Sequence, residues 1–318
     1  MIIGVPKELK EFEGRVGLDS AGARVLIQNG HTVLVQDGAG RLSGFDGTDY
    51  SRARAIMCSQ EEVWKKSELI VKVKEPLPQE YEFFRKGLKI MTFFHFPANT
   101  GLKKECERVG VRTIPYESIR SSEGFRPILR AMSEVAGEVA ADMAAQFLRS
   151  SGGGKGILMS DAVVSIIGVW GNVGDKAYLV IINRAKKIYG LDRFGGPARR
   201  KLDFYISTPE TIANAVSKSD IVIGAAVNRD GGAPHLITRD MIKRMEPGSV
   251  LIDVAIDEGG ISETSRPTTY ANPSYVEEGV VHVCVTNLPG GVPRTSTPSL
   301  VEASLPYILK VANGENVL

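Results

Sequence analysis

Residues 162–174 read AVVSIIGVWGNVG, in which a run of small and apolar residues leads into three glycines at Gly168, Gly171 and Gly174. A buried strand that ends in a glycine-rich turn before a helix lets backbone N–H groups approach a dinucleotide pyrophosphate. The spacing is GxxGxxG rather than GxGxxG, so the motif is an imperfect copy. The stretch predicts the first strand and turn of a dinucleotide-binding sheet.

The residues after the last glycine allow two interpretations. As a helix, residues 175–189 have a cap at Asp175, an apolar stripe and a stop at Gly190. As a strand, residues 177–182 would pair with 163–169 through a tight turn. The helix leaves a phosphate site and the hairpin abolishes it. We favour the helix.

A ribose-binding carboxylate is not evident in either interpretation. In dinucleotide-binding sheets it ends the second strand, about 20 residues after the turn, and no Asp or Glu ends an obvious strand there. The basic residues Arg199, Arg200 and Lys201 would suit a 2′-phosphate, but a solvated run is the simpler interpretation. The choice between NAD and NADP therefore stays open.

Outward from this turn, short β-rich runs alternate with helical patterns along the whole chain, as in α/β folds with mainly parallel sheets. We predict two Rossmann-like domains, one over residues 1–125 to which 290–318 return, and one over 126–289. A helix over residues 133–149 is rich in small residues, which favour close packing. The expected strands are 1–5, 32–36, 69–73, 88–94, 111–115, 162–167, 202–207, 220–226, 249–255 and 280–285, and the other expected helices include 21–29, 59–66, 100–109, 209–218, 238–245 and 299–311.

Composition excludes several classes of protein. The 318 residues carry a net charge of +2, with no basic block that would bind nucleic acid or an anionic membrane. No apolar run approaches the roughly 18 residues that span a bilayer, and the amino terminus lacks the pattern of a signal peptide. Cys58, Cys106 and Cys284 are far apart, as expected of a reduced cytoplasmic protein without a zinc finger or disulfide scaffold. We expect no metal site.

Several polar residues follow strand-like runs, where α/β sheets bind their ligands. A guanidinium can hold a carboxylate through two hydrogen bonds, and a histidine can move protons near neutral pH. Each residue alone also has an ordinary interpretation, as a surface arginine, a solvated loop, a core histidine or a loop cap. The candidates are Arg15, Lys74, His95, Asp257 and Asn287.

Taken together, strings along the chain resemble the alanine dehydrogenase family, a relative of the nucleotide-binding subunit of proton-translocating transhydrogenase. The resemblance implies a two-domain cytoplasmic oxidoreductase, usually a homohexamer, that interconverts L-alanine with pyruvate and ammonia using NAD. The strings are MIIGVPKE, EGRVGL, VKVKEPLP, HFPA, PYESI, AMSEVAGEVA, GGKGILM, EPGSVLIDVAIDEGG, ETSRPTTY, VTNLPGGVPRTST and LPYILKVANG.

The resemblance also implies roles for individual residues. His95 matches the acid/base and Asp257 the acidic residue at the reacting centre. Ser133 matches a cofactor contact, beside the turn of Gly168, Gly171 and Gly174. The residues that match the substrate side are Arg15 and Lys74, which bind the carboxylate and carbonyl oxygen, Met132 beside the substrate, and Asn287 near the nicotinamide.

The dinucleotide half departs from the family. Between Gly168 and Phe194 the chain is shorter by roughly ten residues, about one short strand and its turn. We therefore expect a shortened second domain whose ribose-binding Asp is absent or replaced by Ile181. Two alternatives stay open, a redox-neutral lyase or hydrolase for a small amino or 2-oxo acid that has lost NAD binding, and a non-catalytic binder. The partners we expect are a small acid and further copies of the chain, as a hexamer or dimer.

Overall fold

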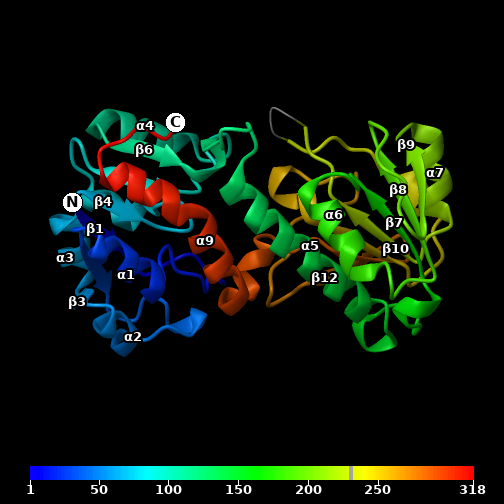
Figure 1. Cartoon of the computed structure of the whole chain (residues 1–318). Coiled ribbons are helices and arrows are strands. Elements are labelled where there is room, and N and C mark those ends of the chain that lie inside the picture. Colours follow the sequence, from blue (N-terminus) through cyan, green and yellow to red (C-terminus); the bar gives the residue numbers. More distant parts are fainter. Residues whose placement is uncertain (229–231) are drawn as a thin grey trace. The chain divides into compact units, whose positions relative to one another are not determined.

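The structure is a computed structural model that describes residues 1–228 and 232–318. The chain divides into two units, a first unit of Met1–Met132 with Pro289–Leu318 and a second unit of Ser133–Leu288. Each unit contains one sheet with helices packed on it (Figure 1). Within the described ranges, none of the helices is both long and apolar enough to cross a bilayer.

The sheet of the first unit has six strands in the order β3-β2-β1-β4-β5-β6, and every neighbouring pair is parallel. The order changes direction between β1 and β4, which makes this position the topological switch point where such sheets bind ligands. Sequence analysis missed the short strand β3. The strands are β1 (Ile2–Val5), β2 (Thr32–Gln36), β3 (Ile56–Cys58), β4 (Leu69–Val71), β5 (Lys89–Thr92) and β6 (Arg112–Pro115).

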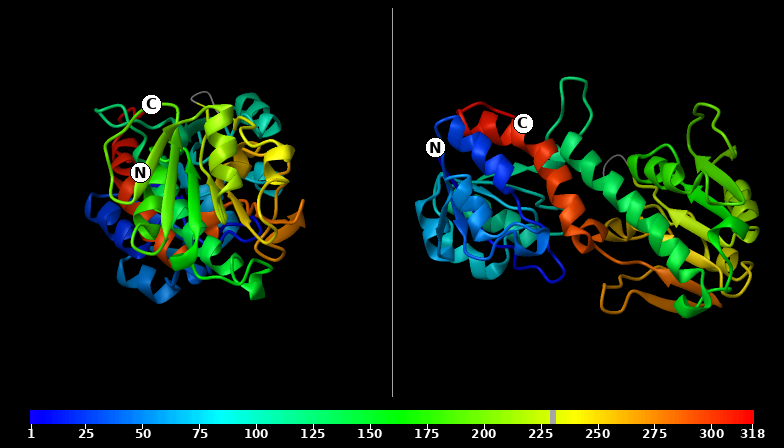
Figure 2. Two further views of the ribbon diagram at one scale, coloured as in Figure 1. Left: turned by 90° about the vertical axis from the view of Figure 1, so that its right-hand side faces the viewer. Right: turned by 60° about the horizontal axis from the view of Figure 1, so that its bottom comes forward.

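The helices of the first unit begin and end where local chemistry requires it. The Asp19 carboxylate accepts a hydrogen bond from the Gly22 N–H and caps α1 (Ser20–Gln28), and Gly30 follows with a φ of +84°. Helix α9 (Pro293–Ala312) begins earlier than expected, since a proline suits the first turn. It packs against α1 (Figure 2). The remaining elements are α2 (Gly47–Arg52), α3 (Gln60–Lys66), α4 (Thr100–Val109), η1 (Arg41–Ser43), η2 (Pro78–Phe83) and η3 (Tyr116–Ser118).

The sheet of the second unit has the order β12-β13-β11-β10-β7-β8-β9. Its parallel part repeats the strand order of the first sheet, and only β12 runs antiparallel, beside β13. The switch point lies between β7 and β10. The strands are β7 (Val163–Ile167), β8 (Lys187–Asp192), β9 (Leu202–Ile206), β10 (Ile221–Gly224), β11 (Val250–Asp253), β12 (Ser274–Glu277) and β13 (Val280–Val283).

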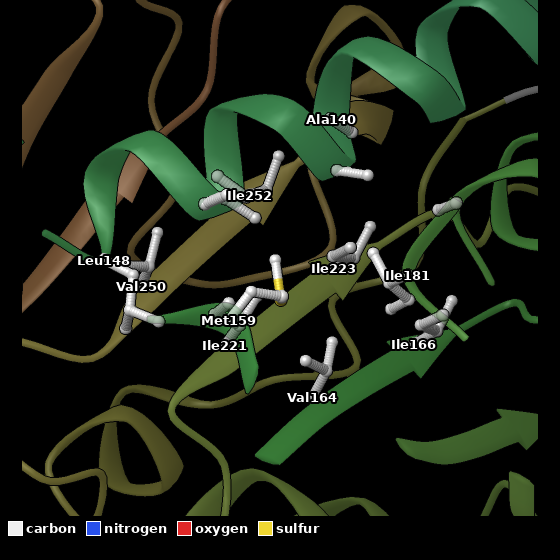
Figure 3. Packing of buried hydrophobic residues seen from close by; sticks show 14 of the residues in the cluster. Ala140, Leu148, Met159, Val164, Ile166, Ile181, Ile221, Ile223, Val250 and Ile252 are labelled. Atoms are coloured by element: carbon white, nitrogen blue, oxygen red, sulfur yellow. The ribbon is translucent and has the colours of Figure 1, made fainter. Parts of the chain in front are cut away.

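Both faces of the central strands of this second sheet are buried. Ile221 and Ile223 of β10 join one core with α5 (Pro127–Phe147) and α6 (Asn172–Ile181), which Figure 3 shows from close by. The residue between them, Val222, joins the opposite core under α7 (Pro209–Ser217) and α8 (Arg239–Ile242). Alternation along a strand thus covers the sheet with helices on both sides.

The small residues of α5 serve close packing, as expected. Ala140, Ala141 and Ala144 are fully buried in the core beside the sheet. A Cβ at Gly137 would lie 2.3 Å from the carbonyl oxygen of Val173 on α6, so the two helices approach within backbone contact there. The helix begins at Pro127 rather than at residue 133.

The turn after β7 leads into helix α6, so the helix interpretation is confirmed and the hairpin is wrong. The helix ends at Ile181, however, and residues 187–192 form β8, which pairs with β7 and β9. Gly190, which we interpreted as a helix stop, lies inside this strand, where a Cβ would meet the Leu202 side chain at 2.8 Å. The second strand of the sheet is therefore present.

Candidate functional site

The carboxyl edge of the first sheet gathers the predicted substrate residues. Strands β1, β4 and β5 are parallel neighbours, so the segments that follow them leave the sheet at one edge. Arg15 follows β1 after a loop, Lys74 follows β4 and His95 follows β5. Arg15 and Lys74 are buried, at 4% and 8% exposure, and His95 is half-buried. Two cations and an imidazole at one edge suit a small anionic acid.

The Arg15 guanidinium is held in one plane. Its Nε donates to Glu13 Oε1 at 2.7 Å, and its Nη2 donates to the other oxygen of the same carboxylate. Its Nη1 contacts the Met132 sulfur at 3.2 Å, which places Met132 beside the guanidinium. Glu13 was not predicted, because its sequence neighbourhood is rich in charges and resembles a solvated loop; its side chain is fully buried.

The backbone of His95 is held by a second carboxylate, that of the half-buried Glu117 on η3. His95 has a φ of +48°, in the left-handed region that costs a non-glycine residue about 1–3 kcal/mol. Its N–H donates to Glu117 Oε1 at 2.8 Å, and the Phe94 N–H donates to the same oxygen at 3.2 Å. Burial raises the pKa of the Glu117 carboxyl, although these N–H groups and Lys74 oppose the shift. Sequence analysis missed Glu117.

The glycines after β7 form a turn that excludes side chains. Gly168 has a φ of +86°, and a Cβ there would lie 2.8 Å from the Ala225 carbonyl oxygen after β10. A Cβ at Gly174 would lie 2.2 Å from the Gly168 carbonyl oxygen. Gly171 is exposed at the start of α6, where the free N–H groups of the first helical turn favour an anion.

Asp192 ends β8 and corrects the prediction that no acidic residue ends a second strand about 20 residues after the turn. Its two carboxylate oxygens accept hydrogen bonds from the N–H groups of Trp170 at 3.0 Å and Arg193 at 2.7 Å. Ile181 does not take its place, because that residue is buried inside α6. A strand interrupted by glycine hid Asp192 from sequence analysis, although its distance from the turn was the expected one.

A pocket of about 650 Å³ joins these elements within the second unit. This volume is in the range of cofactor sites. A glycine turn, a helix amino terminus and a carboxylate at the end of the second strand fit a dinucleotide. The lining residues include Gly168, Trp170, Gly171, Asp192, Ala225 and His235.

The basic run after β8, residues 199–201, is only partly exposed to solvent. The Arg199 guanidinium pairs with Asp175 and lies 4.8 Å from the ring centre of Trp170 and 5.1 Å from that of Tyr178. Arg200 and Lys201 are exposed. Arg199 therefore packs against residues beside the glycine turn, which differs from the solvated run that the sequence suggested.

Asp257 and Asn287 lie together in the second unit. Asn287 has a φ of +59°, and its N–H donates to Asp257 Oδ2 at 3.2 Å. Asp257 lies on η6 (Val254–Glu258) and is exposed. The buried carboxylate of Asp253 fixes this loop, because it accepts hydrogen bonds from Ala255, Ile261 and Ser265. Burial raises the pKa of the Asp253 carboxyl.

Two further expectations concern Ser133 and metals. Ser133 is half-buried on α5 in the second unit, and its contact with a cofactor stays a prediction. In the two described ranges, no cluster of three or more His, Cys, Asp or Glu side chains has a geometry that would hold a metal ion.

Comparison with known proteins identifies both halves of the chain. Residues 4–136 match the family model "Alanine dehydrogenase/PNT, N-terminal domain", and residues 140–317 match "Alanine dehydrogenase/PNT, C-terminal domain". The chain is 45% identical to the alanine dehydrogenase of Bacillus subtilis, over 98% of this chain and 86% of that one. It is 42% identical to the alanine dehydrogenase of Halomonas elongata, over 98% and 88%. A solved L-alanine dehydrogenase structure has a TM-score of 0.91 at 36% identity, over 98% of this chain and 90% of that chain.

Proposed function

This chain belongs to the alanine dehydrogenase/PNT family, and from that premise we propose that it interconverts L-alanine with pyruvate and ammonia using NAD. The supporting observation is that one sheet edge carries groups suited to a small acid and the other carries groups suited to a dinucleotide. The first edge carries Arg15, Lys74 and His95, and the second carries the glycine turn with Asp192.

The first unit is the proposed substrate domain. The Arg15 guanidinium binds the substrate carboxylate. Its contacts with Glu13 and Met132 fix its orientation before the substrate binds. The Lys74 ammonium binds the carbonyl oxygen of pyruvate and favours negative charge that develops there. Both cations are buried, so their attraction for a small anion is screened less than at the surface.

His95 is the proposed acid/base. In the oxidative direction it removes a proton from the water that adds to the imine of alanine, and it returns the proton as ammonia leaves. Glu117 accepts a hydrogen bond from the left-handed backbone of His95 and so fixes the position of the backbone that carries the imidazole. The Asp257 carboxylate stabilises the positive charge of the imine, and Asn287 is held beside Asp257.

The second unit is the proposed dinucleotide domain. Gly168, Gly171 and Gly174 would hold the pyrophosphate against the start of α6, and the Asp192 carboxylate would accept hydrogen bonds from the ribose hydroxyls. Ser133 is a further proposed contact. When bound, NAD supplies the acceptor for the hydride that leaves the alanine Cα. Asp192 would repel a 2′-phosphate, so we propose NAD rather than NADP.

The alternative hypothesis of a redox-neutral lyase or hydrolase is no longer supported. It rested on a damaged nucleotide half, and β8 with Asp192 supplies the strand and the carboxylate that were missing from the prediction. Nothing in the comparisons favours it. A cytoplasmic homo-oligomer, a hexamer or dimer, remains a proposal that the family resemblance alone supports.

A coupled assay tests the function. Purified protein is mixed with NADH, pyruvate and ammonium, and the absorbance of NADH is followed. We expect the absorbance to fall only when all three are present, and to rise when L-alanine is mixed with NAD. Absence of turnover in both directions would refute the proposal, and turnover without nucleotide would restore the redox-neutral alternative.

A further inference from the structure

A short loop, residues 193–201, connects the parallel strands β8 and β9 and packs against the glycine turn. Parallel neighbours are usually joined by a crossover of about a dozen or more residues that contains a helix, and within this described segment there is no helix. Gly196 lies against the Trp170 ring, since a Cβ there would lie 2.2 Å from the Cε2 atom of that ring. The Tyr178 hydroxyl of α6 donates to the Arg200 carbonyl oxygen at 2.7 Å. The loop is therefore held against both the turn and α6.

The Arg199 side chain reaches from this loop to the start of α6. Its guanidinium pairs with the Asp175 carboxylate, and its Cζ atom lies 4.8 Å from the ring centre of Trp170. The side chains of Arg199 and Asp175 are 26% and 37% exposed, so water screens this pair only in part. Trp170 and Gly171 line the pocket, whereas Arg199 is not among the described residues that do so. Arg199 therefore acts on a bound nucleotide through its neighbours and its charge.

Asp175 places a negative charge beside the proposed pyrophosphate site. It lies in the first turn of α6, and its N–H donates to the Gly171 carbonyl oxygen at 2.8 Å. Helical side chains tilt toward the amino terminus of their helix, so the carboxylate lies alongside the free N–H groups of the first turn. A carboxylate at this position is stabilised by the helix dipole. It also repels a phosphate that binds to the same end of the helix.

The other cations near Asp175 do not cancel its charge. Lys176, the next residue, pairs instead with Glu138 of α5 at 3.1 Å. Arg200 and Lys201 are exposed to solvent. In the described part of the chain, Asp175 forms an ion pair with Arg199 alone. The neutrality of this end of α6 therefore depends on one side chain from the loop.

We propose that Arg199 is a positioning residue of the dinucleotide site, whose charge cancels that of Asp175 and so lets the start of α6 accept a pyrophosphate. This inference rests on the proposed function. The contact with the face of Trp170 holds the guanidinium next to the turn, because a cation is attracted to an aromatic ring. Loss of Arg199 weakens nucleotide binding, and loss of the Asp175 charge strengthens it.

The test is the dissociation constant of NADH, measured by fluorescence for the wild-type protein and its variants. Arg199→Gln should raise the constant about tenfold, the size expected for one unit charge acting through partly solvated protein. Asp175→Asn should lower it several-fold. The double variant should return close to the wild-type value, because both charges are removed together. In about 1 M KCl the effect of Arg199→Gln should shrink to less than about threefold, since salt screens the charge of Asp175.

Arg200→Gln is the matched control. It removes the same charge from the neighbouring, exposed residue and leaves the backbone hydrogen bond from Tyr178 in place. We expect it to change the NADH dissociation constant less than about twofold, because an exposed charge is largely screened.

The double variant separates the electrostatic role from a merely structural one. If Arg199 only anchored the loop, the double variant would bind NADH as weakly as Arg199→Gln, and this result would overturn the proposal. An unchanged constant in Arg199→Gln would overturn it as well. Failure of the wild-type protein to bind NADH would instead overturn the proposed function. If Arg199→Gln does not fold, unchanged or weaker binding in Asp175→Asn refutes the proposal.

Discussion

The two sheets share one strand order but carry opposite kinds of chemistry at their carboxyl edges. After β1, β4 and β5 the first sheet presents the polar side chains Arg15, Lys74 and His95. A buried carboxylate holds the Arg15 guanidinium, and two other carboxylates accept hydrogen bonds from the backbone of Val73 and His95. After β7 and β10 the second sheet presents bare backbone, because Gly168 and Gly174 have no room for a Cβ. A small acid needs charges that point at it, whereas a pyrophosphate needs close approach to N–H groups.

This difference predicts how each edge fails. Removing a side chain from the first edge should affect the chemical step or the binding of the acid and leave nucleotide binding intact. Adding a side chain to the second edge should weaken nucleotide binding and leave the binding of the acid intact. The following variants test that separation in order of decreasing effect.

The largest effect is expected for His95→Ala. Without the imidazole no group moves the protons, and kcat should fall about 10²–10⁴-fold while NADH still binds. His31→Ala, before β2 at the opposite edge of the same sheet, is the control and should change kcat less than about twofold. A near-normal kcat in His95→Ala would remove this histidine from the mechanism.

Gly174→Ala should nearly abolish nucleotide binding. The new Cβ would lie 2.2 Å from the Gly168 carbonyl oxygen, so the turn must shift away from its phosphate-binding form. We expect the NADH dissociation constant to rise at least about 100-fold, measured by fluorescence. Gly195→Ala, whose Cβ would meet nothing within 4 Å, should bind NADH normally. Equal affinities of the two variants for NADH would contradict a phosphate-binding role for the glycine turn.

Asp192→Asn should weaken NADH binding by about tenfold to a hundredfold, the value of one lost pair of charge-assisted hydrogen bonds. NADPH should be affected less, because the variant no longer repels a 2′-phosphate. The ratio of the two dissociation constants is therefore the informative quantity. An unchanged ratio would exclude Asp192 from ribose recognition.

The smallest effect belongs to Glu117→Gln. One oxygen remains to accept from the backbone of His95, but the bond loses the assistance of a charge. We expect kcat to fall about fivefold, the size of roughly 1 kcal/mol, with an unchanged KM for pyruvate. A rise in KM with constant kcat would show that Glu117 acts through Lys74 instead.

The same contrast explains what sequence analysis could predict. Arg15, Lys74 and His95 follow apolar runs directly or after one loop, so their placement at a sheet edge could be inferred from strand order alone. Their supporting carboxylates could not, because Glu13 lies in a charged stretch, Glu117 lies in a short segment with no pattern of its own, and only the tertiary fold brings them to Arg15 and His95.

Strand β8 was missed for a local reason. Its sequence KIYGLD contains a glycine and follows a helix without a clear stop, so the helical pattern was extended through it. Pairing with β7 and β9 on both sides overrides that weak preference. Strands β3 and β12 were missed because they lie at sheet edges and leave Ile56 and Val276 exposed.

We propose that the second unit binds a nicotinamide dinucleotide despite the irregular spacing of its glycines. A fluorescence titration of the wild-type protein with NADH, repeated with NADPH, tests it most directly. We expect saturable binding of NADH and at least tenfold weaker binding of NADPH, because the Asp192 carboxylate disfavours a second negative group at the ribose. No binding of either nucleotide at millimolar concentration would contradict the account.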